Sequence, residues 1–237
     1  TDKPQFEYHY IDYTYPGIMM KQNVLAVLAR KARGTYLLVT DADIQQHPTW
    51  VAQHVAALNE PGMEMSTGPT IVQGGSFFAD MQALDWIAGV STMKAGDALG
   101  FPITSVGNNM AFRRARYEEL GGYENIPFSI TEDYKLYEQF RNRGWHMQWL
   151  FNAEALNLST HIPTFRGLLH QRKRWFKGGS EIPWYSMALF GVYAATPFCI
   201  LVAWLLGGWQ VGVPLLVTKV ASDVLVEATG AVIFRRT

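Results

Sequence analysis

Two aspartates separated by one residue follow a short apolar run in the first quarter of the chain. Asp41 and Asp43 come directly after Tyr36–Thr40, a run typical of a buried parallel strand. Alternate side chains of an extended segment point the same way, so the two carboxylates could converge on one position. Mg²⁺ or Mn²⁺ bound to a nucleotide diphosphate needs one or two carboxylates, with phosphate oxygens completing its coordination. Acidic residues also end many strands and cap many helices, and this motif alone leaves both interpretations open.

A second acidic motif, Ile130-Thr131-Glu132-Asp133, lies farther along the chain. Thr131 could cap a helix that has Glu132 and Asp133 in its first turn, and the local pattern alone favours this interpretation. The chemical alternative makes one carboxylate a general base that removes a proton from an attacking hydroxyl group. The neighbouring sequence does not exclude this chemical role.

Between the acidic motifs lies Gly107-Asn108-Asn109-Met110-Ala111-Phe112-Arg113-Arg114. A glycine followed by two amides suits a backbone segment that approaches a ligand closely. A plain turn followed by a strand explains the pattern almost as well. Gly121-Gly122-Tyr123 is then typical of the end of a helix and a turn.

The last motif is Gln171-Arg172-Lys173-Arg174-Trp175. Arginine forms forked contacts with phosphate, and an exposed tryptophan offers a flat face for stacking. Basic and aromatic residues are also common just outside a membrane span. That second explanation is strong for Arg172 and Lys173, and weaker for Gln171, Arg174 and Trp175 taken together.

The composition excludes some classes of protein. Charged residues make up 17% of the 237 residues and hydrophobic residues 49%, so an ordered chain is expected. The formal net charge of zero gives no support to a nucleic-acid partner. The one cysteine, Cys199, cannot form an internal disulfide.

Strand and helix patterns alternate along the first part of the chain. Aromatic residues predict a strand at Phe6–Ile11, and apolar spacing predicts helices at Lys21–Arg33 and Pro48–Leu58. With the strand at Tyr36–Thr40 this order predicts an α/β sheet, whose ligands should bind at the carboxyl ends of the strands.

The composition changes near residue 183. Trp184–Trp209 contains no Asp, Glu, Lys or Arg and is long enough to cross a bilayer as a helix. A second apolar stretch, Val211–Phe234, carries three charged residues four positions apart, so it could be a second span or an interfacial helix. We therefore expect a catalytic region over residues 1–182, including an interfacial segment, and a transmembrane region of about two helices over 183–237. The charged residues of the second stretch are Lys219, Asp223 and Glu227.

Basic residues flank the apolar region on both sides. Arg172–Arg174 and Lys177 precede it, and Arg235 and Arg236 follow it. Under the positive-inside rule both clusters are cytoplasmic. We expect an integral protein of the inner or plasma membrane, in contact with membrane lipids, whose catalytic region faces the cytoplasm.

Taken in order, the four motifs D-x-D, G-N-N-x-A-F-R-R, T-E-D and Q-x-x-R-W before apolar helices resemble those of the family 2 glycosyltransferases. The likeness is greatest to the processive branch that includes cellulose, chitin and hyaluronan synthases, and it covers roughly residues 5–237. It implies a GT-A fold, in which a mixed, mostly parallel sheet is flanked by helices. The first strands of such a fold would precede Thr1, so we expect the chain to be N-terminally truncated.

The resemblance also implies roles for individual residues. Asp133 corresponds to the catalytic base, and Asp43 to the ligand of Mg²⁺ or Mn²⁺. The residues expected to bind the nucleotide-sugar donor, most simply a UDP-sugar, are Asp41, Lys21, Gln171 and Arg174. Those expected at the acceptor are Trp175, Glu132 and Asn108.

The function that follows is inverting transfer of a sugar to a glycan or lipid-linked hydroxyl group at the cytosolic membrane face, as in polysaccharide synthesis. Transfer of a single sugar to a lipid such as ceramide is the nearest alternative. A non-catalytic membrane subunit that binds nucleotide sugar is a third, against which the presence of both a metal-site acid and a base argues.

Overall fold

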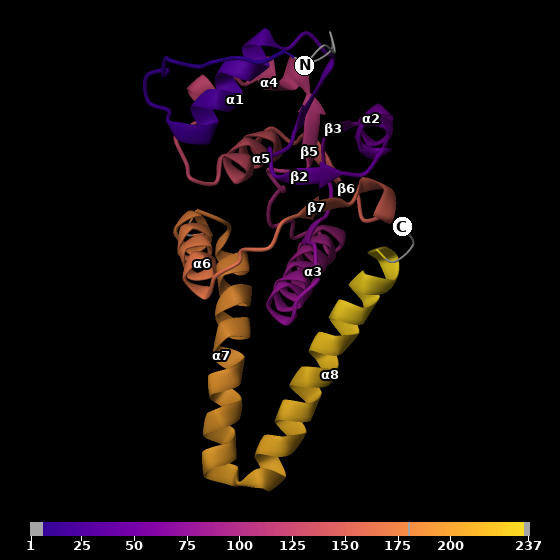
Figure 1. Cartoon of the computed structure of the whole chain (residues 1–237), viewed down its shortest axis with the longest axis vertical. Helices are drawn as coiled ribbons and strands as arrows, with labels where there is room; N and C mark the ends of the chain where they lie inside the picture. Colours follow the sequence, from indigo (N-terminus) through magenta and orange to yellow (C-terminus); the bar gives the residue numbers. More distant parts are fainter. Residues whose placement is uncertain (1–6, 180, 235–237) are drawn as a thin grey trace.

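The strands of the computed structural model, which describes residues 7–179 and 181–234, form two small sheets (Figure 1). The larger sheet has the order β1-β5-β3-β6 and the smaller β2-β7-β4. The strands of the larger sheet are β1 (Tyr36–Val39), β5 (Met110–Arg113), β3 (Met63–Thr67) and β6 (His146–Trp149). Those of the smaller sheet are β2 (Ile44–Gln46), β7 (Asn157–Ser159) and β4 (Thr70–Val72).

Helices surround the two sheets and continue beyond them. The longer ones are α1 (Met20–Lys31), α2 (Trp50–Asn59), α3 (Phe77–Ala98), α5 (Glu132–Asn142), α6 (Phe165–Gly179), α7 (Trp184–Gly207) and α8 (Trp209–Phe234). Short helical segments are α4 (Arg114–Glu119), η1 (Tyr123–Asn125) and η2 (Ala153–Ala155). The mixed α/β class and the helices predicted at the positions of α1 and α2 are confirmed.

The prediction of a mostly parallel sheet is wrong. Strand β5 runs antiparallel to both β1 and β3, and β2 runs antiparallel to β7. Only the pairs β3–β6 and β4–β7 are parallel among the described strands. Buried strands are apolar in either direction, so the sequence pattern could not reveal that β5 runs against its neighbours.

The strand predicted at Phe6–Ile11 is also absent from the described part of that segment. Residues 7–15 have no regular structure, and Phe6 lies outside the described residues. The segment is held instead by the side chain of Asn23 in α1. Its amide nitrogen donates to the carbonyl of Tyr13, and its oxygen accepts from the backbone N–H of Tyr15, both at 2.9 Å. A side-chain amide thus satisfies backbone groups that a neighbouring strand would otherwise pair.

The main core lies between the larger sheet and helices α1 and α5. Buried apolar side chains from these elements pack around Phe112 of β5, whose ring centroid lies 5.5 Å from that of Tyr117 and 6.1 Å from that of Phe140. This core fixes the positions of the first turns of α1 and α5 relative to the end of β1.

Helices α7 and α8 form a long hairpin that extends away from the sheets (Figure 1). Within the described residues, α7 is the one helix that is long and apolar enough to cross a membrane by length and composition. Helix α8 returns to the sheet region and packs on α3, where a methyl group at Gly230 would lie 2.5 Å from the side chain of Ile87. The second span remains a prediction, and Arg235 and Arg236 lie outside the described residues.

Candidate active site

Lys21, in the first turn of α1, joins the two acidic motifs. Its Nζ atom lies 2.6 Å from Oδ1 of Asp41, just beyond β1, and 3.1 Å from Oε1 of Glu132, at the start of α5. The Glu132 side chain is buried, whereas those of Lys21 and Asp41 are about one-third exposed. The D-x-D and T-E-D motifs, separated by some ninety residues, therefore share one ammonium group.

The carboxylate of Asp133 is held by backbone groups. Its Oδ2 accepts a hydrogen bond from the N–H of Gly107, and its Oδ1 accepts from the N–H of Tyr134, both at 2.8 Å. The hydroxyl of Ser105 donates to the backbone carbonyl of Asp133 at 3.0 Å. A Cβ atom at Gly107 would lie 2.7 Å from Oδ2, so glycine is needed here for close approach to the carboxylate.

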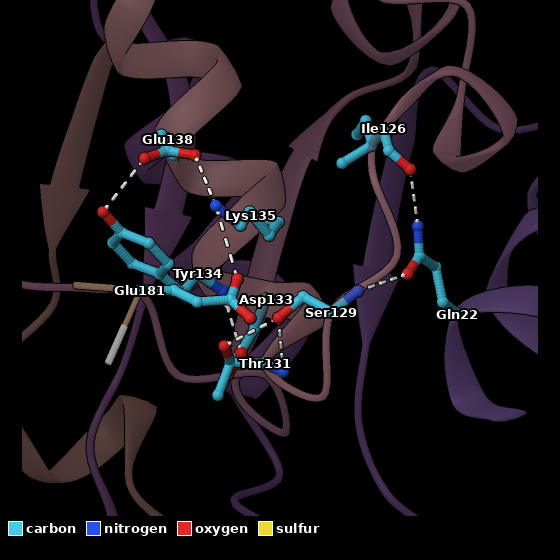
Figure 2. Close-up of polar contacts among 9 residues, drawn as sticks. All are labelled: Gln22, Ile126, Ser129, Thr131, Asp133, Tyr134, Lys135, Glu138 and Glu181. Atoms are coloured by element: carbon cyan, nitrogen blue, oxygen red, sulfur yellow. Dashed lines mark hydrogen bonds and ion pairs between the residues drawn. The ribbon is translucent and has the colours of Figure 1, made fainter. Parts of the chain in front are cut away.

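The segment that leads into α5 is anchored to α1 by the buried amide of Gln22 (Figure 2). The amide nitrogen donates to the carbonyls of Tyr123 and Ile126, and the amide oxygen accepts from the N–H of Ser129. The hydroxyl of Ser129 in turn accepts from the N–H of Thr131 at 2.9 Å. One buried side chain thus fixes the approach to the T-E-D motif.

Thr131 occupies the N-cap position of α5, but its hydroxyl does not cap the helix. The hydroxyl is paired with that of Ser129 at 3.0 Å instead. Glu132 and Asp133 lie in the first turn, as either interpretation of the motif required. Asp133 also accepts a first-turn N–H, and this position at the helix end does not exclude a chemical role for its carboxylate.

The charges of this cluster influence each other. Burial alone would lower the pKa of Lys21, but the attraction of Glu132 and Asp41 outweighs it and raises that pKa. Burial, followed by the charge of Asp133, raises the pKa of Glu132, which Lys21 opposes. Burial also raises the pKa of Asp133, against the backbone hydrogen bonds that favour its charged form. Asp133 is therefore more basic than an exposed aspartate.

Helix α6, which carries the Q-x-x-R-W motif, packs against the T-E-D motif. A Cβ atom at Gly178 would lie 2.3 Å from Cγ2 of Thr131, so the helix backbone directly contacts this residue. Gln171 and Arg174 precede Gly178 by seven and four positions and so share its face of the helix. Beyond α6, Glu181 pairs with Lys135 of α5 at 3.3 Å (Figure 2). The fourth motif thus lies beside the third.

Trp175 is partly buried, contrary to the exposed side chain expected from sequence. Its ring lies edge-to-face with Trp86 of α3, with 5.4 Å between centroids, and the guanidinium of Arg172 lies 4.6 Å from its ring centroid. Arg172 also pairs with Asp85 of α3. These contacts fix α6 on α3, and the acceptor-binding role of Trp175 remains a prediction.

The two amides after Gly107 have different surroundings. Asn109 is fully buried, and its side chain pairs with Trp50, His54 and the carbonyls of Pro69 and Ala155. Asn108 is partly exposed, and its amide oxygen accepts from the hydroxyl of Thr70 at 2.7 Å. Asn109 is therefore a structural residue, while the role of Asn108 at the acceptor remains a prediction.

Asp43 is exposed in the connection between β1 and β2. The described residues contain no group of three or more His, Cys, Asp or Glu side chains that could hold a metal by themselves. A divalent cation that takes most of its ligands from a diphosphate needs fewer protein carboxylates, and an exposed aspartate beside the site fits this requirement. Asp41 is less suited to that role, because Lys21 already pairs with it.

Some residues of the site were not identified from sequence. Gln22, Ser105 and Gly178 act through contacts with segments far away in the chain. The serine and the glutamine belong to no recognisable motif. Gly178 lies three positions beyond the last motif. Its spacing from Gln171 and Arg174, which places all three on one helix face, was the one feature of the sequence that could have indicated its role.

Residues 10–237 match the family model described as glycosyl transferase family 21. This match covers nearly the whole chain, including all four motifs. No curated protein gives a significant match to the sequence. The likeness to processive synthases remains a prediction.

Proposed function

The chain belongs to glycosyl transferase family 21, and we propose that it moves a sugar from a nucleotide-diphosphate sugar to an acceptor hydroxyl with inversion at the anomeric carbon. The observation that carries this mechanism is the way Asp133 is held. Two backbone N–H groups orient its carboxylate, and each oxygen keeps a lone pair for an incoming hydroxyl group.

Asp133 is the proposed general base. Inversion proceeds by one displacement, in which the acceptor oxygen attacks the anomeric carbon while the diphosphate departs from the opposite face. The acceptor proton passes to Asp133 as the new carbon–oxygen bond forms. Its raised pKa suits this task, because a base works best when its pKa lies close to the operating pH. The transition state has oxocarbenium character, as in glycoside hydrolysis.

The departing diphosphate requires positive charge. Asp43 is the proposed protein ligand of Mg²⁺ or Mn²⁺, which would stabilise charge that develops on the diphosphate. Arg174 and Gln171, on the face of α6 that contacts Thr131, are proposed to bind the same group. We propose a UDP-sugar as the donor and place the site at the cytosolic face of a membrane that α7 crosses.

The acceptor is proposed to be a glycan or a lipid-linked hydroxyl group. A single transfer to a lipid is the second candidate, and the position of α6 favours it. This helix ends five residues before α7 and carries exposed Phe165 and Phe176 beside its basic residues. Such a helix suits a site whose acceptor comes from the membrane surface. Product length separates the candidates, because a polymerase adds many sugars and a single-sugar transferase adds one.

The test of the mechanism is Asp133→Asn in the purified protein in lipid nanodiscs. Donor turnover is measured as UDP release from a panel of UDP-sugars with Mg²⁺ or Mn²⁺ and a lipid extract. We expect a loss of about 10²–10⁴-fold, the range typical of a general base. Thermal stabilisation by the donor should persist, because Asp133 lies on the acceptor side. Exposed Asp12→Asn is the matched control. Turnover that is unchanged in Asp133→Asn would contradict the assignment.

A further inference from the structure

The ammonium group of Lys21 has two carboxylate partners inside the protein. Its Nζ atom is within 2.6 Å of Asp41 and 3.1 Å of Glu132. An ammonium group has three donors, so most of its hydrogen-bonding capacity is used before any ligand arrives. A lysine intended mainly for the donor's phosphates would be expected to keep this capacity free.

The start of α1 holds Lys21 from both sides. Met20 has a φ of +54°, and among the described residues it is the one non-glycine residue with positive φ. This conformation costs on the order of 1–3 kcal/mol and persists only where surrounding contacts enforce it. On the other side, Gln22 is buried and tied to the segment that leads into α5. The backbone around Lys21 is therefore fixed relative to T-E-D.

Glu132 and Asp133 are consecutive carboxylates, and two neighbouring negative charges oppose each other's ionisation. The ionisable groups that act on them are Lys21 from α1 and Tyr123 from η1, while Asp41 acts through Lys21. Burial raises the pKa of Tyr123 well above 10, so this phenol is neutral in the working range. Lys21 is then the group whose positive charge favours the charged form of both Glu132 and Asp133.

We propose that Lys21 is a positioning residue that acts on the base through its own charge and through Glu132, and on the D-x-D motif through Asp41, rather than a ligand of the donor's phosphates. This inference rests on the proposed function, because it assumes that Asp133 is the base. It follows that removal of the ammonium leaves Glu132 without its counter-charge beside Asp133. Proton transfer to Asp133, rather than donor binding, should then respond to the change.

The first experiment compares Lys21→Met and Lys21→Arg with wild type, with exposed Lys31→Met of the same helix as the matched control. UDP release is measured from pH 5 to 9. In Lys21→Met we expect the rising limb of the pH profile to move up by about one pH unit, because a nearby uncompensated negative charge raises the pKa of the base. The KM for the UDP-sugar should change less than threefold, and Lys21→Arg should restore the wild-type profile. A tenfold higher KM with an unmoved profile would overturn the proposal in favour of donor binding.

The second experiment does not depend on turnover. Thermal unfolding midpoints of wild type and Lys21→Met are compared from pH 5 to 8. The difference should widen as pH rises, because both carboxyl groups become charged and only the wild type has the ammonium. In the double variant Lys21→Met/Glu132→Gln the widening should be smaller, because only Asp133 still becomes charged over this range. A difference independent of pH would overturn the proposal. If wild type releases UDP from no UDP-sugar, the proposed function fails, and this measurement still tests the role of Lys21.

Discussion

The loop of residues 105–109 belongs to two polar clusters that are built in opposite ways. On one side, Ser105 and Gly107 hold Asp133, which lies beside charged Glu132 and Lys21. On the other side, Asn109 is surrounded by neutral partners, and its side chain is completely buried. Gly107 of the first cluster and Asn109 of the second are only two residues apart along the loop.

The two clusters differ in whether their polar side chains have used all of their hydrogen-bonding capacity. Both N–H groups of the Asn109 amide donate, and its oxygen accepts from Trp50 and is paired with His54. A buried network in which every member is paired makes the fold rigid. The Asp133 carboxylate, by contrast, accepts one backbone hydrogen bond on each oxygen and retains capacity on both. The cluster around Asn109, here called the sealed cluster, supports the loop. The cluster around Asp133 keeps the acceptor capacity that the proposed base requires.

The largest effect on stability is expected when the sealed cluster is broken. Asn109→Ala leaves buried Trp50 and His54 without their acceptor and the carbonyl of Ala155 without its donor, while the carbonyl of Pro69 keeps the N–H of Asn157. Each unsatisfied buried group costs about 1–3 kcal/mol, so we expect a loss of at least 3 kcal/mol. In a protein of this size that corresponds to a thermal midpoint roughly 6–12 °C lower.

The contrast is sharpened by measuring the midpoint of Asp133→Asn at pH 8 in the same experiment. An amide at this position loses one of the two backbone hydrogen bonds but no longer buries a charge, so the midpoint should fall less than in Asn109→Ala. Equal losses of stability in Asn109→Ala and Asp133→Asn would show that the two clusters do not differ as described.

A smaller effect, on turnover, is expected from Gly107→Ala. The added methyl group would lie 2.7 Å from Oδ2 of Asp133, so the carboxylate must shift away from its backbone donor. Misplacement of a catalytic group by about 1 Å can cost on the order of a hundredfold in rate. We expect kcat to fall about tenfold to a hundredfold, as measured by UDP release.

Gly89→Ala, in the middle of α3, is the matched control for this change. A methyl group at Gly89 meets no atom within 4 Å, and alanine is the better helix former. Its midpoint and turnover should match or exceed those of wild type. If Gly107→Ala behaves in the same way, the close approach of this loop to Asp133 does not matter for catalysis.

The sequence could predict which motifs meet, but not how they are joined. Helices α1 and α2 and the strand before Asp41 followed from apolar spacing, because their buried faces leave a periodic pattern. The four motifs were recognised by their order. Their contacts, such as Gly178 on Thr131, depend on segments brought together by the whole fold.

The features that the sequence predicted wrongly or left open also depend on contacts between distant segments. The direction of β5 is decided by its two neighbours, and an apolar strand looks alike in both directions. The hydroxyl of Thr131 could have capped α5, and only the position of Ser129 explains why it does not. The polar partners of Lys21 and Asn109 also come from distant segments. Residue type alone therefore gave no indication of which polar residues support the fold and which are candidates for the reaction.

The smallest expected effect is a pH dependence of stability that comes from His54. Burial lowers the pKa of His54 to about 4, below its ordinary value of 6.5, despite its hydrogen bond with Asn109. The unfolded chain therefore binds a proton more readily than the folded protein between these values. Stability from this group is present above pH 6.5 and is lost as the pH falls towards 4. From pH 7 to pH 5 we expect a loss of about 2 kcal/mol.

The measurement is the free energy of unfolding of wild type and His54→Gln by denaturant at pH 7, 6 and 5. His54→Gln should be less stable at pH 7, since the pairing with Ser66 and Asn109 is disturbed, but its additional loss at pH 5 should be smaller by about 2 kcal/mol. Taking the difference between variants removes the opposite trend of Glu132 and Asp133, which lose charge more readily as the pH falls. Exposed His146→Gln should follow the wild-type dependence. If the free energies of unfolding of wild type and His54→Gln change with pH in the same way, the sealed cluster accepts a proton on His54. The contrast between a neutral and a charged cluster at this loop would then be wrong.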